Sequence, residues 1–394
     1  MSQLKVNAIS DAAGANGNAI TLANDGTCTV KATNKPGHNL IINGSCLIAQ
    51  RATSSTSHGL TTVDRISTYE TNTNAGTKTW SQADITSGGA YDVGFRKAFK
   101  IATSQAGNTS TASAYMSAYA TKLEAQDIAN SGWKYVDPNS KVTLSFWIKA
   151  STADNFQLQL VTDDGTKKKY NTTVAATTSW TKITRTIPGH ADLTFTNDNG
   201  KGLTVQLIVA TGSDMAGTVT QNAWGANTVA AVAADQINTW LAAGAGTIET
   251  TGWQLEVGDV ATDFEHRTYA DELIRCMRYY QKLTFGADIP GNTTGTSVVT
   301  CVSFNSSNAY GGFPAMVPFR SGGTDIAFSH STVGGSGHWG YLENGSDKAV
   351  TDIDDQDKTT TKTISLLVQG SLDDHVGTLR ATHGDAYLAW DNEL

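Results

Sequence analysis

The sequence predicts a mainly β protein that contains one well-marked α-helix. Glycine fills 38 of the 394 positions, whereas charged residues make up only 16% and proline occurs six times. This composition favours strands and turns over helices. Apolar and polar residues also alternate in many short runs, which is the pattern of strands with one buried face. Because 394 residues exceed one ordinary hydrophobic core, we expect two or three domains.

The stretch from Trp253 to Lys282 joins the two halves of the chain. Its first part alternates apolar and polar residues as far as Val257, which predicts a strand followed by a turn at 258–259. Thr268 and Asp271 then form a capping-box pattern, so we expect a linking helix over 268–285. One face of this helix is apolar and needs a partner surface. We expect that face to form the interface of a homotrimer, through Leu273, Ile274, Met277 and Tyr280.

The first 36 residues contain three short alternating runs separated by turn residues, at 4–8, 20–22 and 28–32. A segment of this size cannot bury enough apolar area to be stable alone, so we interpret 1–36 as an attachment segment that packs on another chain. The run from Asn39 to Arg51 is predicted as the first strand of the main domain. In a jelly roll the first and last strands often lie side by side, so we expect this strand next to Trp253–Val257.

The main domain is predicted to span residues 37–267. Clear strand patterns occur at 142–148, 156–160, 180–185 and 203–209, with hairpin turns at 163–165 and 197–200. Many short strands with this spacing indicate a jelly-roll β-sandwich. A long alanine-rich insert over 212–250 interrupts the pattern, and the helical spacing of six apolar residues predicts a short helix over the sandwich: Val229, Val232, Ala233, Ile237, Trp240 and Leu241.

Residues 286–394 are predicted to form a C-terminal β-sandwich domain, with strands at 298–304, 326–328, 363–368 and 387–390. Its loops are rich in glycine, and binding residues tend to lie in such loops. Sugars stack their apolar faces on aromatic rings, so the loop aromatics are the candidate receptor- or glycan-binding residues: His338, Trp339, Tyr341, Tyr310 and Phe313. A buried plug inside the loop is an equal alternative. Five other aromatics lie in or beside strands and are expected in the core or an interface: Trp133, Phe146, Trp147, Trp180 and Trp253.

Charge and motifs argue against several functions. A net charge of −8 gives no basic footprint for nucleic acid, and neither a signal region nor a long apolar run indicates secretion or membrane insertion. Four cysteines form no closely spaced pair and are expected as free thiols. Nucleophile, zinc and nucleotide motifs are absent, so we expect no enzyme.

We interpret the adjacent Glu265, His266 and Arg267 as salt-bridge and capping residues. Calcium at Asp352–Asp357 is the one cofactor considered, on the basis of its oxygen ligands.

Three segments carry a resemblance: Gln254–Lys282, Asn39–Arg51 and the final Ala386–Leu394. Together they resemble a family of bacteriophage tail-fibre or receptor-binding proteins. In that family a jelly roll similar to carbohydrate-binding modules precedes a helix and a C-terminal β-domain. The resemblance implies a virion tail protein made in the host cytoplasm, which docks to phage tail proteins through its N-terminus. It also implies a distal C-terminal tip that binds a bacterial surface glycan or another receptor. A polysaccharide-degrading tail enzyme and a structural tail adaptor without receptor contact remain alternatives.

Overall fold

The computed structural model confirms the mainly β class. It describes residues 8–10, 18–22, 28–30, 37–107, 112–227, 231–235, 237–285, 296–322, 326–328, 339–343, 346–354, 360–370, 372, 375–381 and 386–394. Near the N-terminus, an antiparallel three-stranded sheet contains β1 (Ala8–Ser10), β2 (Asn18–Leu22) and β3 (Cys28–Val30). No helix in the described part of the chain is long and apolar enough to cross a membrane.

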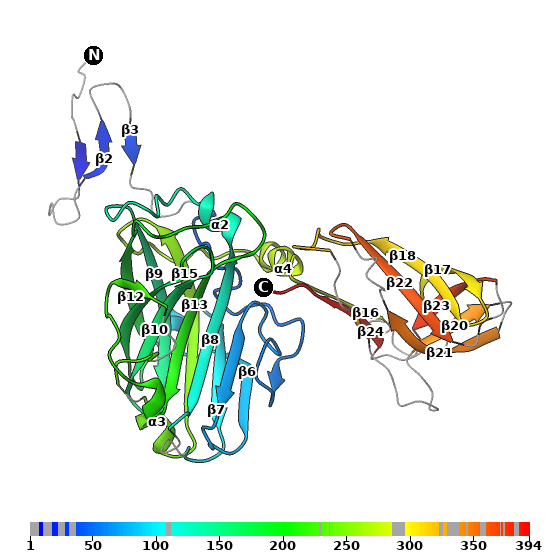
Figure 1. The fold of residues 1–394 in the computed structure, drawn as a ribbon, viewed down its shortest axis with the longest axis horizontal. Helices are drawn as coiled ribbons and strands as arrows, with labels where there is room; N and C mark the ends of the chain where they lie inside the picture. Colours follow the sequence, from blue (N-terminus) through cyan, green and yellow to red (C-terminus); the bar gives the residue numbers. More distant parts are fainter. Residues whose placement is uncertain are drawn as a thin grey trace.

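Two six-stranded antiparallel sheets pack face to face and form the main domain (Figure 1). Sheet I has the order β12 (Thr181–Pro188), β9 (Lys141–Ala150), β15 (Thr247–Val257), β7 (Lys97–Thr103), β6 (Lys78–Asp84) and β4 (Ser54–Ser55). Sheet II has the order β14 (Trp224–Ala226), β11 (Lys168–Ala176), β10 (Asp154–Thr162), β13 (Lys201–Thr211), β8 (Tyr115–Glu124) and β5 (Ser67–Thr71). The strands predicted at 142–148, 156–160 and 203–209 lie within β9, β10 and β13, and the one predicted at 180–185 coincides with β12 except for its first residue, so these predictions are confirmed.

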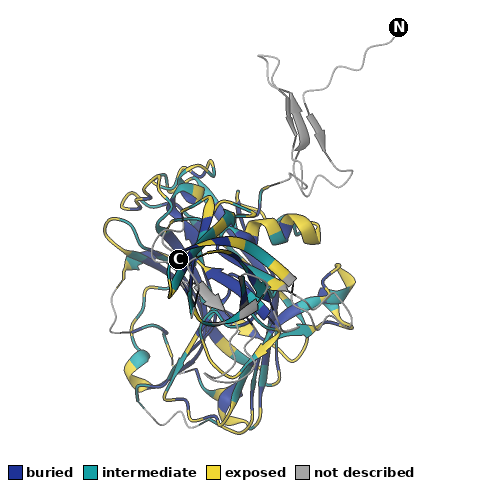
Figure 2. Ribbon diagram, turned by 90° about the vertical axis from the view of Figure 1, so that its right-hand side faces the viewer, coloured by how far each residue is buried: buried dark blue, intermediate teal, exposed yellow. Residues whose placement is uncertain are grey.

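The centre of the sandwich is a stack of three aromatic rings. Trp253 lies between Phe146 and Tyr119, with a centroid distance of 3.8 Å on each side and nearly parallel ring planes. The three rings come from β15, β9 and β8, so the stack joins the two sheets across their interface. All three are completely or almost completely buried, and each contributes on the order of 2–3 kcal/mol through the apolar surface it removes from water. Figure 2 shows the buried segments enclosed between the more exposed strands and loops.

The segment from Asn39 to Arg51 lies beside β15 as expected, but it is a series of turns and the predicted strand is wrong. The Leu40 amide donates to the Leu255 carbonyl at 2.9 Å, and the Trp253 amide donates to the Gly44 carbonyl at 3.0 Å. Asn43 adopts a left-handed φ of 58°, and its side-chain oxygen accepts from the Ile48 amide. Such side-chain bonds replace the regular pairing of a strand.

The insert contains a short helix, α3 (Thr239–Ala242), as expected, but only the end of the predicted apolar spacing belongs to it. Ala233, Ile237, Trp240 and Leu241 nevertheless belong to the sandwich core, whereas Val229 lies outside the described residues. The insert also covers part of the outer face of sheet II. There Gln159 donates to the Val232 carbonyl at 2.7 Å, and the Lys169 ammonium donates to the Ala231 carbonyl at 3.1 Å.

The linking helix is α4 (Tyr269–Met277), which begins where the capping box predicts. The Asp271 amide donates to the Thr268 hydroxyl at 3.2 Å. The helix ends well before residue 285, because β16 (Tyr280–Phe285) already pairs with β24 (Ala386–Asp391). Among the residues predicted to form the trimer interface, Met277 and Tyr280 are buried within the chain, Leu273 is half-buried and Ile274 is 53% exposed. Trimer formation itself stays a prediction.

The C-terminal strands close into a barrel, whereas a two-sheet sandwich was expected. The barrel order is β17 (Thr296–Asn305), β18 (Asn308–Pro314), β22 (Thr363–Gly370), β21 (Ser346–Asp354), β20 (Trp339–Glu343) and β23 (Val376–Ala381). β23 pairs with β17 as well as with β20, so the sheet closes on itself and no edge strand remains. β16, β24 and β19 (Ile326–Phe328) form a separate three-stranded sheet between the barrel and the sandwich.

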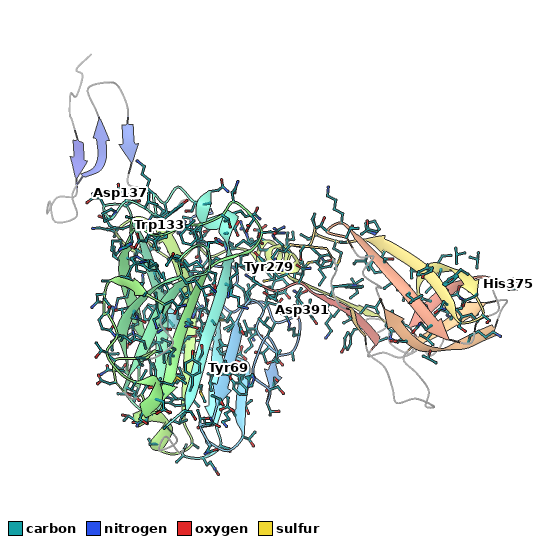
Figure 3. The ribbon with its side chains drawn as sticks, viewed as in Figure 1. Tyr69, Trp133, Asp137, Tyr279, His375 and Asp391 are labelled. Atoms are coloured by element: carbon teal, nitrogen blue, oxygen red, sulfur yellow. The ribbon has the colours of Figure 1, made fainter. Side chains whose placement is uncertain are left out.

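A polar junction connects the ends of the C-terminal region to the sandwich. Arg278 forms two hydrogen bonds to the buried carboxylate of Glu124 at the end of β8. Near the C-terminus, Arg51 pairs with Asp391 at 2.9 Å and Arg65 pairs with Glu393. Figure 3 shows Tyr279 and Asp391 at this junction, with His375 at the far end of the barrel. The chain therefore enters and leaves the C-terminal region at the same place.

The described thiols are free and buried. Burial raises the pKa of Cys46 to about 12 and that of Cys301 to about 11, and it also raises the pKa of Cys276. These thiols are consequently protonated and unreactive near neutral pH. The prediction of free thiols is confirmed for these three residues, whereas the side chain of Cys28 lies outside the described part.

Candidate functional site

Two of the predicted receptor-binding aromatics fill the barrel core. Trp339 and Tyr341 lie on β20, where only 5% and 0% of their surfaces are exposed, so their placement in an open loop is wrong. The Tyr341 hydroxyl donates to the Cys301 carbonyl at 3.1 Å inside the barrel. A Cβ atom at Gly377 would lie 2.4 Å from the Tyr341 ring, so glycine makes room for that ring. His338 lies outside the described residues.

The other two predicted aromatics lie on β18 and are half-buried. Tyr310 stacks on the exposed ring of Phe304 at a centroid distance of 5.1 Å, and Phe313 packs edge-on against Trp390. Receptor binding through these two rings stays a prediction. The calcium hypothesis also stays a prediction, because Asp355–Asp357 lie outside the described residues while Asp352 and Asp354 belong to β21.

A pocket of about 390 Å³ opens on the outer face of sheet I, where β12, β9 and β15 lie side by side. We call it the β9 pocket. Its lining combines aromatic rings with a few polar side chains, and it consists of Val93, Phe95, Ser145, Trp147, Lys182, Gly252, Asp263, Phe264 and His266.

Strand alternation places the first wall of this pocket. Phe146 and Ile148 point into the sandwich core, so Trp147 between them points outward. Lys182 on β12 is the register partner of Trp147 and therefore lies on the same outer face. Trp147 and Trp180 were expected in a core or interface. Both are half-buried on the outside of the sheet, where they pack against a small separate core that includes Phe95. Phe146, Trp133 and Trp253 belong to the sandwich core as predicted.

Two glycines bring the backbone close to these indoles. A Cβ atom at Gly88 would lie 3.0 Å from the Trp180 ring, and one at Gly89 would lie 2.9 Å from the Trp147 ring. Gly89 begins the short helix α1 (Gly89–Asp92), and Gly88 before it has a φ of 89°. The α1 segment therefore packs directly on both tryptophans and restricts their orientations.

The opposite wall consists of Phe95, Phe264 and His266. The two phenylalanine rings meet at 4.8 Å, and the Phe264 and His266 rings meet at 5.0 Å, each pair close to edge-on. A nitrogen of His266 lies 3.1 Å from the Val93 carbonyl oxygen, which holds the imidazole against the α1 segment. At a bulge in β15, Gly252 has a φ of 67°, and a Cβ atom there would lie 2.5 Å from Phe95.

The neighbours of His266 have purely structural contacts. Glu265 accepts from the Gly37 and Asn39 amides at 2.6 and 2.8 Å, and Arg267 donates to the Asn39 carbonyl at 2.6 Å. Burial raises the pKa of Glu265, but these amides and Arg267 outweigh it and hold the pKa below its ordinary value. The structural interpretation of Glu265 and Arg267 is confirmed. Sequence reasoning missed that His266 turns the other way, into the pocket wall.

The β9 pocket has the chemistry of a small polar-ligand site with apolar faces. Lys182 and Asp263 are exposed at its rim, and Ser145 lies buried at its base. Ligand pockets range over roughly 300–1,000 Å³ and combine aromatic walls with a few placed polar groups. Aromatic faces accept the apolar face of a sugar ring, and the polar groups can bond its hydroxyls.

Comparison with known proteins leaves the family open. Neither the protein-family models nor the curated proteins contain a match to this chain. Among solved structures, the chain is similar to the enzymatically active domain of bacteriophage CBA120 tailspike protein 4, with 10% identity and a TM-score of 0.30 over 57% of this chain. The matched part spans only 22% of that chain.

Two carbohydrate-binding structures are also similar to this chain. The N-terminal cellulose-binding domain of a Cellulomonas fimi β-1,4-glucanase shows 10% identity and a TM-score of 0.26, over 54% of this chain and 98% of that one. The family 11 carbohydrate-binding module of Clostridium thermocellum, in complex with a mixed-linked tetrasaccharide, shows 12% identity and a TM-score of 0.25, with the same coverage. These low scores carry no functional argument, so the interpretation of the pocket rests on its own residues.

Proposed function

We propose that this protein is a receptor-binding protein of a bacteriophage tail, which adheres to a glycan of the bacterial surface through the β9 pocket. The observation that carries this proposal is the pocket itself, in which the half-buried rings of Trp147 and Phe264 meet the exposed side chains of Lys182 and Asp263. The resemblance of Asn39–Arg51 and Gln254–Lys282 to phage receptor-binding proteins supports the tail assignment.

The apolar and polar side chains of this pocket have different roles in binding. Trp147 offers an indole already fixed by the α1 backbone, so little side-chain freedom remains to be lost when a sugar stacks on it. Lys182 can donate to sugar hydroxyls, Asp263 can accept from them, and both extend from the rim. An ordered apolar wall with flexible polar groups at its edge suits one or a few sugar rings at the end of a longer glycan.

We propose binding without hydrolysis. Glycoside hydrolysis uses two carboxyl groups that face each other across the scissile bond. Asp263 is the one carboxylate among the described residues that line the β9 pocket. This single carboxylate in the described lining supports binding over hydrolysis as the proposed activity.

We test the function first with a printed array of bacterial surface glycans. The full-length protein is expected to bind a restricted subset of the array, whereas the Lys182→Ala variant binds the same glycans more weakly. Lys134→Ala provides a matched control, because Lys134 is another exposed lysine on the sandwich but lies outside the pocket. Equal binding by the Lys182 variant and the parent would count against the pocket.

The bound glycans are then incubated with the protein and assayed for new reducing ends. The proposal predicts none above the level of a buffer control. Turnover that depends on the protein would instead establish the polysaccharide-degrading alternative. A protein that binds no surface glycan, and whose antibodies fail to block phage adsorption, would be a structural tail adaptor.

A further inference from the structure

A second pocket lies at the opposite edge of the sandwich, between β4, β5 and β6. We call it the β5 pocket. It has a volume of about 520 Å³ and is lined by Thr56, Ser57, His58, Glu70, Gly76, Thr77, Lys78 and Trp80. In sheet I, β12 and β4 are the two edge strands, so the two pockets lie at opposite ends of one strand order. Three strand spacings separate β9 from β6, which corresponds to roughly 14 Å across the sheet.

The β5 pocket also has an aromatic side. The His58 ring lines it and lies 5.3 Å from the Tyr69 ring, which in turn lies 5.9 Å from Tyr115. Tyr69 is 51% exposed, and Figure 3 shows it on the sandwich, away from the junction residues Tyr279 and Asp391. Behind His58, Trp80 meets its ring edge-on at 6.4 Å. A continuous series of rings thus extends from the core of the sandwich to its surface.

The polar side of this pocket is an ordered pair of opposite charges. Lys78 lies 3.3 Å from one carboxylate oxygen of Glu70, and the Thr73 hydroxyl donates to the other at 2.6 Å. The Glu70 and Lys78 side chains are only 18% and 13% exposed, so both groups are held in place. A charged pair fixed in this way, beside hydroxyl side chains, presents both donors and acceptors for a ligand rich in hydroxyl groups.

We propose that the β5 pocket is a second saccharide-binding site on the same chain. This inference rests on the proposed function, because it takes the same class of ligand as the β9 pocket. The exposed His58 ring, which packs on Tyr69, would receive the apolar face of a sugar, while Glu70 and Lys78 bond its hydroxyls. With sites at two edges, one chain can engage two glycans of a dense surface, and linked binding of this kind raises the apparent affinity by about 10²–10⁴-fold where the geometry allows both contacts.

The test is saturation-transfer NMR of the full-length protein with methyl glycosides of glucose, galactose, mannose and N-acetylglucosamine. Four proteins are compared with the parent: Trp147→Ala, His58→Ala, the two changes combined, and His190→Ala. His190 is the matched control, because it is another histidine of the sandwich, with a side chain 39% exposed, that lies outside both pockets. Circular dichroism establishes that each variant is folded.

If the two sites are independent, each single variant should retain part of the signal from the bound glycoside. In the combined variant this signal should fall about tenfold or more. His190→Ala is expected to match the parent. Complete loss of signal in Trp147→Ala alone would overturn the second site and leave the proposed function intact. A combined variant with the same signal as Trp147→Ala would have the same consequence. Complete loss of signal in His58→Ala alone would place all binding in the β5 pocket and overturn the β9 assignment. A parent protein that binds none of the glycosides would contradict both.

Discussion

Replacement of Glu124 by glutamine is expected to weaken the junction between the sandwich and the C-terminal region. The Glu124 carboxylate has no exposed surface and accepts from Arg278 Nε at 2.7 Å, Arg278 Nη2 at 2.8 Å and the Tyr279 hydroxyl at 2.6 Å. A glutamine keeps one carbonyl oxygen and turns an NH₂ group toward these donors, so at least one bond to a charged group is lost. Each such bond contributes about 1.5–3 kcal/mol, and breaking a buried pair costs about 3–5 kcal/mol.

We expect Glu124→Gln to lower the free energy of unfolding by about 3 kcal/mol, at the lower end for a buried pair because Arg278 remains 32% exposed and can bond water. Chemical denaturation followed by tryptophan fluorescence measures the loss. Glu249→Gln serves as the control, because the Lys149–Glu249 pair at 3.2 Å is partly exposed on both sides and should contribute less than about 1 kcal/mol.

This junction also predicts a pH dependence. Burial raises the pKa of Glu124, but the bonds from Arg278 and Tyr279 outweigh burial and hold the pKa below its ordinary value of 4.5. The carboxylate therefore stabilises the fold above pH 4.5, and the stabilisation is lost as the pH falls through the folded pKa. Glu124→Gln should remove this part of the acid sensitivity. A variant within about 0.5 kcal/mol of the parent at neutral pH, with unchanged acid sensitivity, would refute the reasoning.

Three further predictions concern single residues. Trp339→Ala should lower the free energy of unfolding by about 3–5 kcal/mol in thermal or chemical denaturation, because the ring fills the barrel core. Unchanged stability would indicate that the Trp339 ring is exposed at the surface. Thr268→Ala should lower stability by about 1 kcal/mol through loss of the α4 N-cap, measured in the same way, and no loss would show that the cap contributes nothing. Burial raises the pKa of Asp64 to about 6, although the charge of Arg51 lowers it. The contribution of Asp64 to stability should therefore fall as the pH rises from 3.8 to 6. A carbon-detected NMR titration should give a midpoint near 6, and a midpoint near 3.8 would contradict this.

The sequence predicted most of the sandwich because its strands alternate clearly. Runs such as Val142–Ile148 have one apolar face, and that face alone decides which side is buried. The N-terminus of α4 was predicted for a similar reason, since Thr268 and Asp271 are local signals. The helix C-terminus was not, because pairing of Tyr280–Phe285 with Ala386–Asp391 joins residues more than one hundred positions apart.

The candidate site was harder to find from sequence for two reasons. In the barrel, Trp339 and Tyr341 alternate around Gly340 as strand residues do, but the surrounding glycines favoured a loop interpretation. In the sandwich, Phe146 and Trp147 are consecutive on a strand, so one of the two rings must face outward. That signal was present for Trp147. The other wall, from Phe95 and His266, depends on a long-range approach of two loops, which no local pattern encodes.

The central claim is that the β9 pocket binds a glycan, and the most direct measurement is the affinity of Trp147→Ala for a glycan selected on the array, by isothermal titration calorimetry. The indole of a half-buried Trp147 stacked on a sugar should contribute about 1.5–3 kcal/mol, so the variant is expected to bind about 10- to 100-fold more weakly than the parent. Trp147→Phe, which keeps an aromatic face, should retain most of the affinity. A folded Trp147→Ala variant that binds the glycan as tightly as the parent would contradict the claim.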